Sequence, residues 1–473
     1  MASLDTNIII IALPAIASDL HTSLLTLVWI VLGYWLVTAS ILMNLGRLSD
    51  MFGRVRLYNL GFIVFTTGSG LCSISQTGEQ LMLFRIVQAL GAAFLFSNSA
   101  AIITDAFPEE ERGRALGLNQ VSIVVGSVIG LVFGGFLTSY LGWRSIFWVN
   151  LPIGVFAIVW SYTKLHELGS IKKEKIDWLG NAALAGGLFL ILIGITFGSF
   201  GIFGSNNTGF STYVFVIAGL GLIALFVFIE KNTIRPMFDL SLFRIKEFVG
   251  GDIAIFLNSL ARGAFVLVMT FYLQGPSMRL TPLEAGIYLI PISLSLSICG
   301  PISGWAADKY VSASRILPPV GLFISAVGFL MLTQVGIKVS LTDTLLPLTL
   351  IGAGMGIFAS PNRATIMSSV PKNRRGIAAG TSTTLVVAGS TLSLGLAFLI
   401  MTHIMPLTSV ENVMLASFGN QNQNHIGTTK DSGMEGFVAS IHFIFFLSAI
   451  LMLVSIVPSV IREKRSKREQ ASH

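Results

Sequence analysis

Residues 24–45 read LLTLVWIVLGYWLVTASILMNL and residues 46–56 read GRLSDMFGRVR, and the change between these two stretches decides the fold. The first stretch is apolar and uncharged. Because about 20 mostly apolar helical residues cross the ~30 Å hydrocarbon core of a bilayer, this run is long enough to span a membrane. The second stretch carries Arg47, Arg54 and Arg56, which is typical of a short loop beside the membrane.

The composition of the whole chain agrees with that alternation. Of its 473 residues, 53% are hydrophobic and 11% are charged, and the mean hydropathy is +0.79. Globular proteins average about 25% charged residues. A soluble protein of this size could not cover its surface with so few charges, which excludes a water-soluble enzyme and a disordered chain. Cys72 and Cys299 lie inside apolar runs and read as small buried side chains, which excludes a disulfide framework.

Apolar runs of similar length recur along the chain. They lie near 24–45, 57–76, 80–104, 115–140, 145–162, 178–200, 212–230, 248–273, 284–307, 316–337, 344–368, 377–402 and 437–460. A shorter run from Ile8 to Ala17 brings the number to fourteen. Every backbone amide in lipid must be satisfied internally, so these runs are predicted to be helices and the chain an all-α polytopic membrane protein.

The first run poses a problem of length. The residues between Asp5 and Asp19 are too few to cross a bilayer, and Pro14 is among them. Either residues upstream of Met1 belong to this helix, or the first helix is a half-helix capped by protein. We favour the first alternative because a helix end exposed to lipid is costly.

The distribution of lysine and arginine predicts the orientation. Most of the 30 lie in alternate loops and in the C-terminal tail. The opposite side holds Arg144, Arg279, Lys338 and Lys430. Such an asymmetry places the basic side and both termini in the cytoplasm, and it explains the net charge of +7 without nucleic acid as a partner.

The chain also repeats itself at long range. Gly46-Arg-Leu-Ser-Asp50 matches Gly304-Trp-Ala-Ala-Asp308, and Pro108-x4-Gly113-x3-Gly117 matches Pro371-x4-Gly376-x3-Gly380. Both pairs lie on the basic side at equivalent places, as in transporters built from two parallel six-helix bundles. This predicts an N-terminal bundle over 1–163, a two-helix linker over 164–246, and a C-terminal bundle with a basic tail over 247–473.

These motifs resemble the major facilitator superfamily, and specifically its fourteen-span drug:proton antiporter-2 family. The loop at 46–56 is similar to the superfamily's signature between the second and third helices. Three further stretches are similar to family motifs. These are Leu4-Asp5-Thr6 with Ala12-Leu13-Pro14 in the first helix, Arg85-x2-Gln88-x2-Gly91 in the fourth, and Gly142-Trp143-Arg144 with Asn150-Leu-Pro-Ile-Gly154 at the turn between the fifth and sixth. The resemblance implies the major facilitator fold with 6+2+6 helices in two pseudo-symmetric bundles, and proton-driven export of drugs without a resident cofactor.

Three positions depart from the family pattern. The fifth-helix motif has Leu131 where the family usually has proline, Ala89 stands for a glycine of the fourth helix, and Ile10 stands for an asparagine of the first. These departures leave the predicted fold unchanged. They weaken the prediction of proton antiport.

Ionisable residues inside apolar runs are the candidates for function, because each costs about 2.5–3.5 kcal/mol in a membrane interior. The predicted proton and substrate pathway comprises Asp5, Arg85, Gln88, Asn150, Asp252, Asn258, Arg262 and Arg363. Arg85 lies mid-helix and should face a cavity or a carboxylate; the resemblance gives it a role in proton coupling, and a structural hydrogen bond is the alternative. If Met1 is the true start, Asp5 becomes an ordinary interfacial residue. Asp252 could likewise be an ordinary carboxylate near a helix start.

The C-terminal arginines bear on the substrate. Arg363 follows Ser360-Pro361-Asn362, a predicted helix break whose freed carbonyls could hold it. The predicted pathway contains three arginines (Arg85, Arg262 and Arg363) and two acids (Asp5 and Asp252), so its net charge is neutral to positive. Neutral or anionic substrates are therefore as plausible as cationic drugs.

Two further groups have roles implied by their motifs. Gly46, Asp50, Gly53, Arg54, Arg112 and Asp308 form the predicted gating loops. By resemblance, Asp50 pairs with a basic group or helix end of the opposite bundle in the outward-open state, and a locally satisfied charge cluster is the alternative. Gly126, Gly130, Gly134 and Gly135 recur at about four-residue spacing and are predicted to pack helices closely.

The sequence contains no Walker lysine motif, metal-ligand cluster or nucleophile elbow, so an enzyme or an ATP-driven pump is unsupported. We therefore expect a monomeric multi-pass protein of the cytoplasmic membrane. It would work by alternating access, exporting amphipathic small molecules by proton antiport. A carrier of anionic metabolites, by symport or facilitated diffusion, is the alternative. The predicted partners are the lipid bilayer, a small-molecule substrate and protons.

Overall fold

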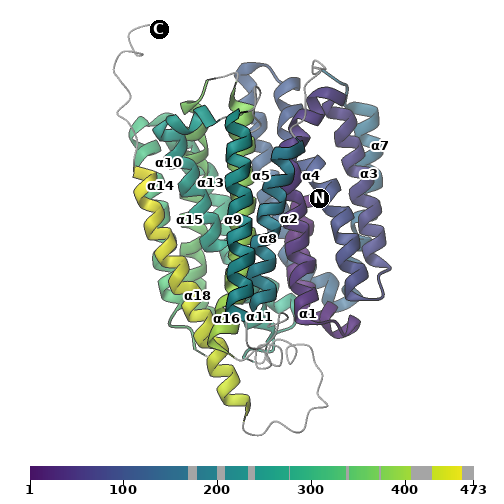
Figure 1. Cartoon of the computed structure of the whole chain (residues 1–473), viewed down its shortest axis with the longest axis vertical. Coiled ribbons are helices and arrows are strands. Elements are labelled where there is room, and N and C mark those ends of the chain that lie inside the picture. Colours follow the sequence, from purple (N-terminus) through teal and green to yellow (C-terminus); the bar gives the residue numbers. More distant parts are fainter. Residues whose placement is uncertain are drawn as a thin grey trace.

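The computed structural model describes residues 1–168, 178–199, 208–232, 240–275, 277–336, 340–371, 374–405 and 429–460. Every regular element in these ranges is a helix, and most helices run nearly parallel to one long direction (Figure 1). Twelve helical stretches in the described ranges are long and apolar enough to cross a membrane. The predicted class, an all-α polytopic membrane protein, is confirmed.

The helices of the first half are α1 (Ala2–Leu20), α2 (Leu24–Phe52), α3 (Arg54–Ser73), α4 (Gly78–Ala106), α5 (Glu109–Leu141), α6 (Ser145–Trp148) and α7 (Asn150–Lys164). Then follow α8 (Trp178–Ser199), α9 (Thr208–Asn232) and the 3-10 turn η1 (Leu240–Arg244). The remaining helices are α10 (Lys246–Arg262), α11 (Phe265–Gln274), α12 (Pro282–Tyr288), α13 (Ile290–Lys309), α14 (Val311–Leu332), α15 (Leu341–Ser369), α16 (Arg375–Ile404) and α18 (Thr429–Val460). The twelve spans do not include α3, which is less apolar, or α5, in which the search of the described residues finds the apolar stretch Val125–Leu141.

Packing divides the helices into groups that follow the chain. In the first half, α1 packs on α5, and both α2 and α3 pack on α4. In the second half, α10 packs on α15, α16 and α18, and α14 packs on α15. The helices α8 and α9 form a pair, and α8 contacts both α2 and α16 (Figure 1). The α8–α9 pair therefore lies at the junction of the two groups; the domain boundaries at 163 and 246 stay a prediction.

The first helix differs from the expectation drawn from its length. It includes both Asp5 and Asp19, runs over 19 residues, and is apolar enough to count among the twelve spans. Both carboxylates have cationic partners, Asp5 with Arg85 and Asp19 with Arg144. A paired carboxylate can lie inside a membrane helix. The apolar segment therefore does not end at either acid.

Three predicted runs are interrupted, and one predicted break is absent. The runs near 145–162, 248–273 and 284–307 are divided into α6 and α7, α10 and α11, and α12 and α13. Conversely, α15 continues through Pro361, where a break was predicted. Proline is tolerated in membrane helices because neighbouring groups satisfy the freed backbone. The prediction of a break that holds Arg363 is therefore wrong.

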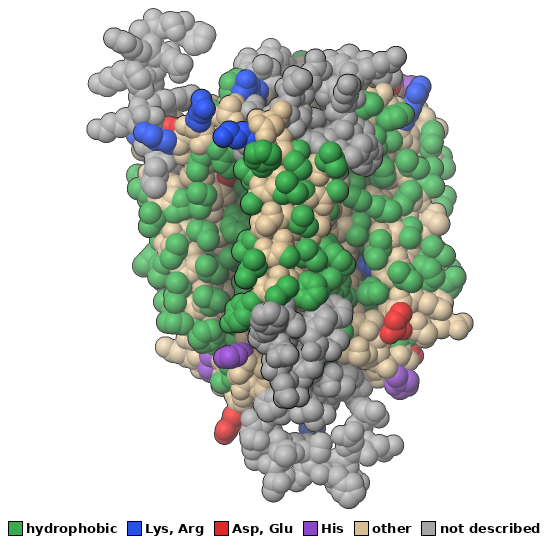
Figure 2. Space-filling model, viewed as in Figure 1, with side chains coloured by type: hydrophobic (Ala, Val, Ile, Leu, Met, Phe, Trp, Pro, Cys, Tyr) green, Lys and Arg blue, Asp and Glu red, His purple; other side chains and the backbone are tan. Residues whose placement is uncertain are grey.

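The face of the bundle seen in Figure 2 is largely apolar along its height, and the coloured charged side chains lie mainly near its two ends. Exposed aromatic and aliphatic side chains, such as Tyr213 and Ile217 on α9, cover its sides as expected for contact with lipid. We call the end where α2 meets α3 the Gly53 end, and the end where α5 meets α6 the Gly142 end. In the view of Figure 2, the lysine and arginine side chains gather at the upper rim, which is the Gly53 end.

Helices of the two halves contact each other at the Gly142 end. Here α5 packs on α12 and α13, and α1 packs on α11. The backbones approach closely: a Cβ atom added to Gly286 of α12 would lie 2.7 Å from the carbonyl oxygen of Leu131 of α5. The buried amide of Gln274 at the end of α11 donates to the carbonyl oxygen of Ile11 of α1 at 2.9 Å. We call these α5–α12 and α1–α11 contacts the inter-half seal.

Candidate functional site

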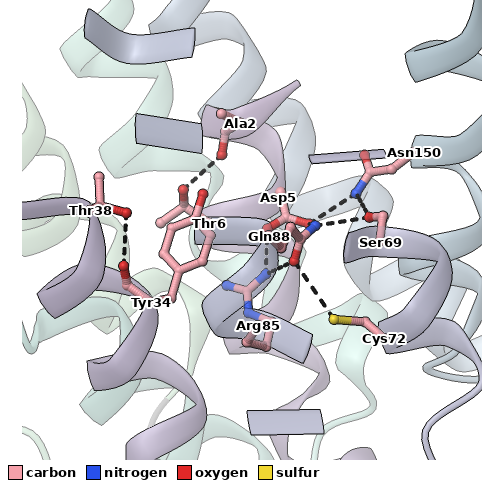
Figure 3. Close-up of polar contacts among 10 residues, drawn as sticks. All are labelled: Ala2, Asp5, Thr6, Tyr34, Thr38, Ser69, Cys72, Arg85, Gln88 and Asn150. Atoms are coloured by element: carbon pink, nitrogen blue, oxygen red, sulfur yellow. Dashed lines mark hydrogen bonds and ion pairs between the residues drawn. The ribbon is translucent and has the colours of Figure 1, made fainter. Parts of the chain in front are cut away.

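The most buried charges in the described part of the chain form an ion pair between α1 and α4. The Nη1 atom of Arg85 lies 2.5 Å from Oδ2 of Asp5 (Figure 3). Arg85 is 1% exposed and Asp5 is 0% exposed. Leaving either charge unpaired at such a depth would be strongly destabilising, so each residue requires the other. This pair joins two residues that the sequence singled out separately.

Two amide side chains donate to Asp5, and the hydroxyl of Ser69 contacts both of these amides (Figure 3). Gln88 donates from Nε2 to Asp5 Oδ1 at 2.9 Å, and its Oε1 accepts from Arg85 at 2.6 Å. Asn150 donates from Nδ2 to the same Asp5 oxygen at 2.9 Å. The hydroxyl of Ser69 accepts from both amides, at 2.8 Å and 3.0 Å. We call these five residues the Asp5 network.

Local structure explains why these residues meet. Arg85 and Gln88 are three residues apart in α4 and so share one face of that helix. Asn150 is the first residue of α7, placed there by the short helix α6 and the turn before it. Gly68 lets α3 approach α4, because a Cβ at that position would lie 2.7 Å from the Cα atom of Gln88. This close approach brings Ser69 within reach of Gln88.

Two further side chains border the network and were missed by the sequence analysis. The ring of Tyr34 of α2 lies against the guanidinium of Arg85, with 4.1 Å from Cζ to the ring centroid, a cation–π contact. The thiol of Cys72 lies 3.9 Å from Oε1 of Gln88. Tyr34, Cys72 and Ser69 belong to ordinary small or apolar stretches, so their spacing gave no signal for this role.

The Asp5 network is a device that can respond to one proton. With Asp5 charged, it accepts hydrogen bonds from three side chains and neutralises Arg85. A proton on Asp5 would remove the ion pair and leave the Arg85 charge with the Gln88 carbonyl and the Tyr34 ring as partners. Such a change alters the attraction between α1 and α4, which is the form of coupling that a proton-linked conformational change needs.

In the second half, α10 carries two separate polar groups. Asp252 is 1% exposed and accepts a hydrogen bond on Oδ1 from the hydroxyl of Ser382 of α16 at 2.5 Å. Arg262, the last residue of α10, donates from Nε to Oδ1 of Asn258 at 3.2 Å, and Asn258 donates to the sulfur of Met452 at 3.3 Å. Ten residues of helix separate Asp252 from Arg262, a rise of about 15 Å. The structure therefore does not join these residues in one site.

Arg363 has a different environment from the one predicted. Its side chain is exposed, and it projects from an uninterrupted α15. The neighbouring Asn362 is buried and donates to the carbonyl oxygen of Gly251 at 3.0 Å. The polar contact at this place is thus made by Asn362, and the sequence analysis had not selected that residue.

Of the predicted gating residues, the structure describes the side chain of Arg54 and the backbone of Gly53. Arg54 forms an ion pair with Asp105, its Nη1 lying 2.7 Å from both carboxylate oxygens. Gly53 has φ of +101°, a conformation that favours glycine, and Glu167 accepts from the backbone N–H of Arg54 and Val55 at 2.9 Å and 3.0 Å. These contacts join Arg54 to Asp105 of α4 and the start of α3 to Glu167, which follows α7 in the chain. Gly46, the side chains of Asp50, Arg112 and Asp308, and the pairing predicted for Asp50 lie outside the part that can be described.

The four glycines of α5 face two partners. Added Cβ atoms at Gly130 and Gly134 would lie 2.6 Å from the Leu4 carbonyl oxygen and 2.5 Å from the side chain of Ile8, both in α1. At Gly135 the Cβ would lie 2.8 Å from Cα of Leu283 in α12, whereas at Gly126 it would make only ordinary contact with α1. Close packing thus holds at three of the four positions, and Gly135 belongs to the inter-half seal.

No group of three or more His, Cys, Asp or Glu in the described ranges could hold a metal ion. Two groups of membrane helices that follow one another along the chain and pack against each other are the arrangement found in many membrane transporters. The family model of the Major Facilitator Superfamily matches residues 1–394. The chain belongs to the major facilitator superfamily and is a transporter rather than an enzyme.

Relatives and solved structures agree with that assignment. The chain is 31% identical over 404 residues to the riboflavin transporter RibZ of Clostridioides difficile (strain 630), and the match covers 84% of each protein. It is 30% identical over 397 residues to the multidrug resistance protein Stp of Mycobacterium tuberculosis (strain CDC 1551 / Oshkosh), covering 83% of this chain and 72% of Stp. A bacterial homologue of the human lysosomal transporter Spinster, crystallised inward-facing and occupied, is similar with a TM-score of 0.62. That match covers 97% of this chain and 93% of the other at 16% identity, and shows the fold alone.

Proposed function

We propose that this chain exports amphipathic small molecules in exchange for protons. It would belong to the fourteen-span drug:proton antiporter-2 family and lie in the cytoplasmic membrane with both termini in the cytoplasm. The observation that carries the proposal is the Asp5 network, a buried carboxylate held by Arg85 between two helices. The drug-resistance name of Stp supports the same substrate class.

The position of Asp5 on α1 suggests how a proton could drive the cycle. The same helix carries Ile11, whose carbonyl oxygen accepts from Gln274 in the inter-half seal. Asp5 and Ile11 are six residues apart, a rise of about 9 Å along the helix. When a proton neutralises Asp5, the tie between α1 and α4 weakens, and α1 becomes free to shift relative to α11. Proton binding would thereby bias the opening of the Gly142 end.

One observation favours the alternative, a carrier of anionic metabolites. Arg262 and Arg363 form no ion pair with any described residue, whereas Arg85 is neutralised by Asp5. Cations without a paired acid attract anionic groups of a substrate. Such a carrier would work by symport or facilitated diffusion.

The proposal is tested with the purified full chain in proteoliposomes whose interior is acidic. Ethidium and riboflavin serve as probes, and uptake is followed by fluorescence with and without collapse of the pH gradient. We expect wild-type uptake to need the gradient and Asp5→Asn to reduce it about 100-fold, because the substitution removes the proton-binding group and unpairs Arg85. Asp19→Asn is the matched control on the same helix. Its carboxylate is half exposed and pairs with Arg144, so uptake should stay within about twofold.

Uptake that is insensitive to the pH gradient in the wild type would contradict antiport. If that uptake instead depended on substrate charge and fell when Arg262 or Arg363 was replaced by Gln, the anion carrier would be favoured. Gradient-driven uptake that survives Asp5→Asn would remove Asp5 from the coupling mechanism.

A further inference from the structure

Asp252 is a buried acid that the proposed coupling through Asp5 does not use. Its Oδ1 accepts from Ser382, and its Oδ2 is buried without a hydrogen-bond partner among the described residues. Asp5 is equally buried but differs in its partners, since Arg85 is its cation and it accepts three hydrogen bonds, from Arg85, Gln88 and Asn150. A charged carboxylate at Asp252 would therefore be poorly compensated, whereas a neutral carboxylic acid would fit this site.

Asp252 has no cationic partner among the side chains that the structure describes around it. The elements packed on α10 are η1, α11, α15, α16 and α18. Their charged and titratable residues, together with those of α10 itself, are Arg244, Lys246, Glu247, Arg262, Tyr272, Asp343, Arg363, Arg375, His403, Lys430, Asp431, Glu435 and His442. Asp252 forms no ion pair with any of these whose side chain the structure describes.

Ser382 is suited to both forms of the acid. A hydroxyl can donate to a carboxylate oxygen or accept from a carboxylic acid, so the contact between α10 and α16 can persist when Asp252 gains or loses a proton. The carbonyl oxygen of the preceding residue on α10, Gly251, accepts a hydrogen bond from the side-chain amide of Asn362 of α15. Asp252 thus lies where three helices of the second half meet.

We propose that Asp252 is a second proton-binding site, separate from the Asp5 network and contributed by the C-terminal half. It holds a proton on its carboxyl group in the conformation described here. It releases the proton when movement of α10 against α16 opens this junction to water. This inference rests on the proposed function, because it gives the antiporter one proton site in each half.

The first experiment measures proton stoichiometry in proteoliposomes. The substrate is ethidium or riboflavin, whichever the wild type transports. The substrate gradient that just balances a fixed pH gradient gives the number of protons moved per substrate molecule. Asp252→Asn keeps an acceptor for the Ser382 hydroxyl but cannot ionise. We expect it to lower the stoichiometry by about one proton while transport continues. Asp343→Asn, at the capping box that begins α15, is the control and should leave the stoichiometry unchanged.

The second experiment does not depend on transport. Infrared difference spectra of the detergent-solubilised full chain, recorded between alkaline and neutral pH, report protonated carboxylic acids through their C=O stretch. We expect a band that Asp252→Asn removes and that Ser382→Ala shifts, because the hydroxyl bonds to that group. A stoichiometry equal to that of the wild type, or a spectrum unchanged by Asp252→Asn, would overturn the proposal. If instead the wild type shows no pH-driven transport but the band is present, the proposed function fails and the proton site stands.

Discussion

Replacing Arg85 with methionine is expected to lower the free energy of unfolding by about 3–5 kcal/mol, because it leaves a buried carboxylate without its cation. Methionine keeps much of the length of the arginine side chain, so the main loss is the charge. Gln88 and Asn150 would still donate to Asp5, but neutral amides cannot replace the ion pair. The measurement is thermal and chemical unfolding of the full chain in detergent micelles, followed by tryptophan fluorescence.

A double variant separates the loss of a charge pair from the loss of packing. Asp5→Asn combined with Arg85→Met removes both charges, so it should recover most of the stability that Arg85→Met alone loses. Arg85→Lys keeps the charge but not the planar group that lies on Tyr34, and an intermediate loss is expected. If Arg85→Met were as stable as the wild type, or the double variant were less stable than Arg85→Met, the ion pair would not be the element that holds α1 against α4.

Much of the Asp5 network could be predicted from the sequence, because polar residues stand out within apolar runs. Asp5 and Arg85 were assigned to the pathway on these grounds, whereas Gln88 and Asn150 were included because they lie in motifs that resemble those of the family, and the structure brings the four together. Ser69 could not be found in this way, since serine is common in membrane helices and its role depends on how closely α3 approaches α4. The same pathway was predicted to include Asp252 and Arg262, which the structure keeps in separate contacts. The sequence therefore identified polar residues within the helices but did not show which of them contact one another.

Helix boundaries were predicted less well, for a physical reason. Helix α10 ends at Arg262, although the predicted apolar run continues to residue 273. The backbone N–H of Ala264, just after the break, donates to the hydroxyl of Ser393 of α16 at 2.9 Å. A break of this kind depends on a partner more than a hundred residues away. At Pro361 the error was the reverse, because a helix break was predicted there and α15 is continuous. The carbonyl oxygen of Pro361 accepts a hydrogen bond from the hydroxyl of Thr365.

The inter-half seal leads to the second large effect, a shift of the conformational equilibrium by Gly286→Leu. A side chain at Gly286 would collide with the backbone of Leu131, and a matching approach occurs between Gly135 and Leu283. Backbone atoms cannot rotate away as a flexible side chain can, so α12 must separate from α5. Overpacking costs about 1–3 kcal/mol, which corresponds to a change of about 5–150-fold in the ratio of closed to open Gly142 ends.

This shift can be measured as a distance. Spin labels at Tyr140 of α5 and Ile287 of α12 lie on exposed positions on the two sides of the seal, and they keep the hydrogen bond between Ser139 and Leu283 in place. In a background with Cys72→Ala and Cys299→Ala, Gly286→Leu should shift the distribution of label distances toward longer values, because α12 must separate from α5. Gly300→Leu is the matched control, because a Cβ atom at Gly300 meets no atom within 4 Å. A folded Gly286→Leu protein with the distance distribution of the control would show that the α5–α12 contact does not hold the Gly142 end closed. The closing role would then fall to Gln274 and Ile11.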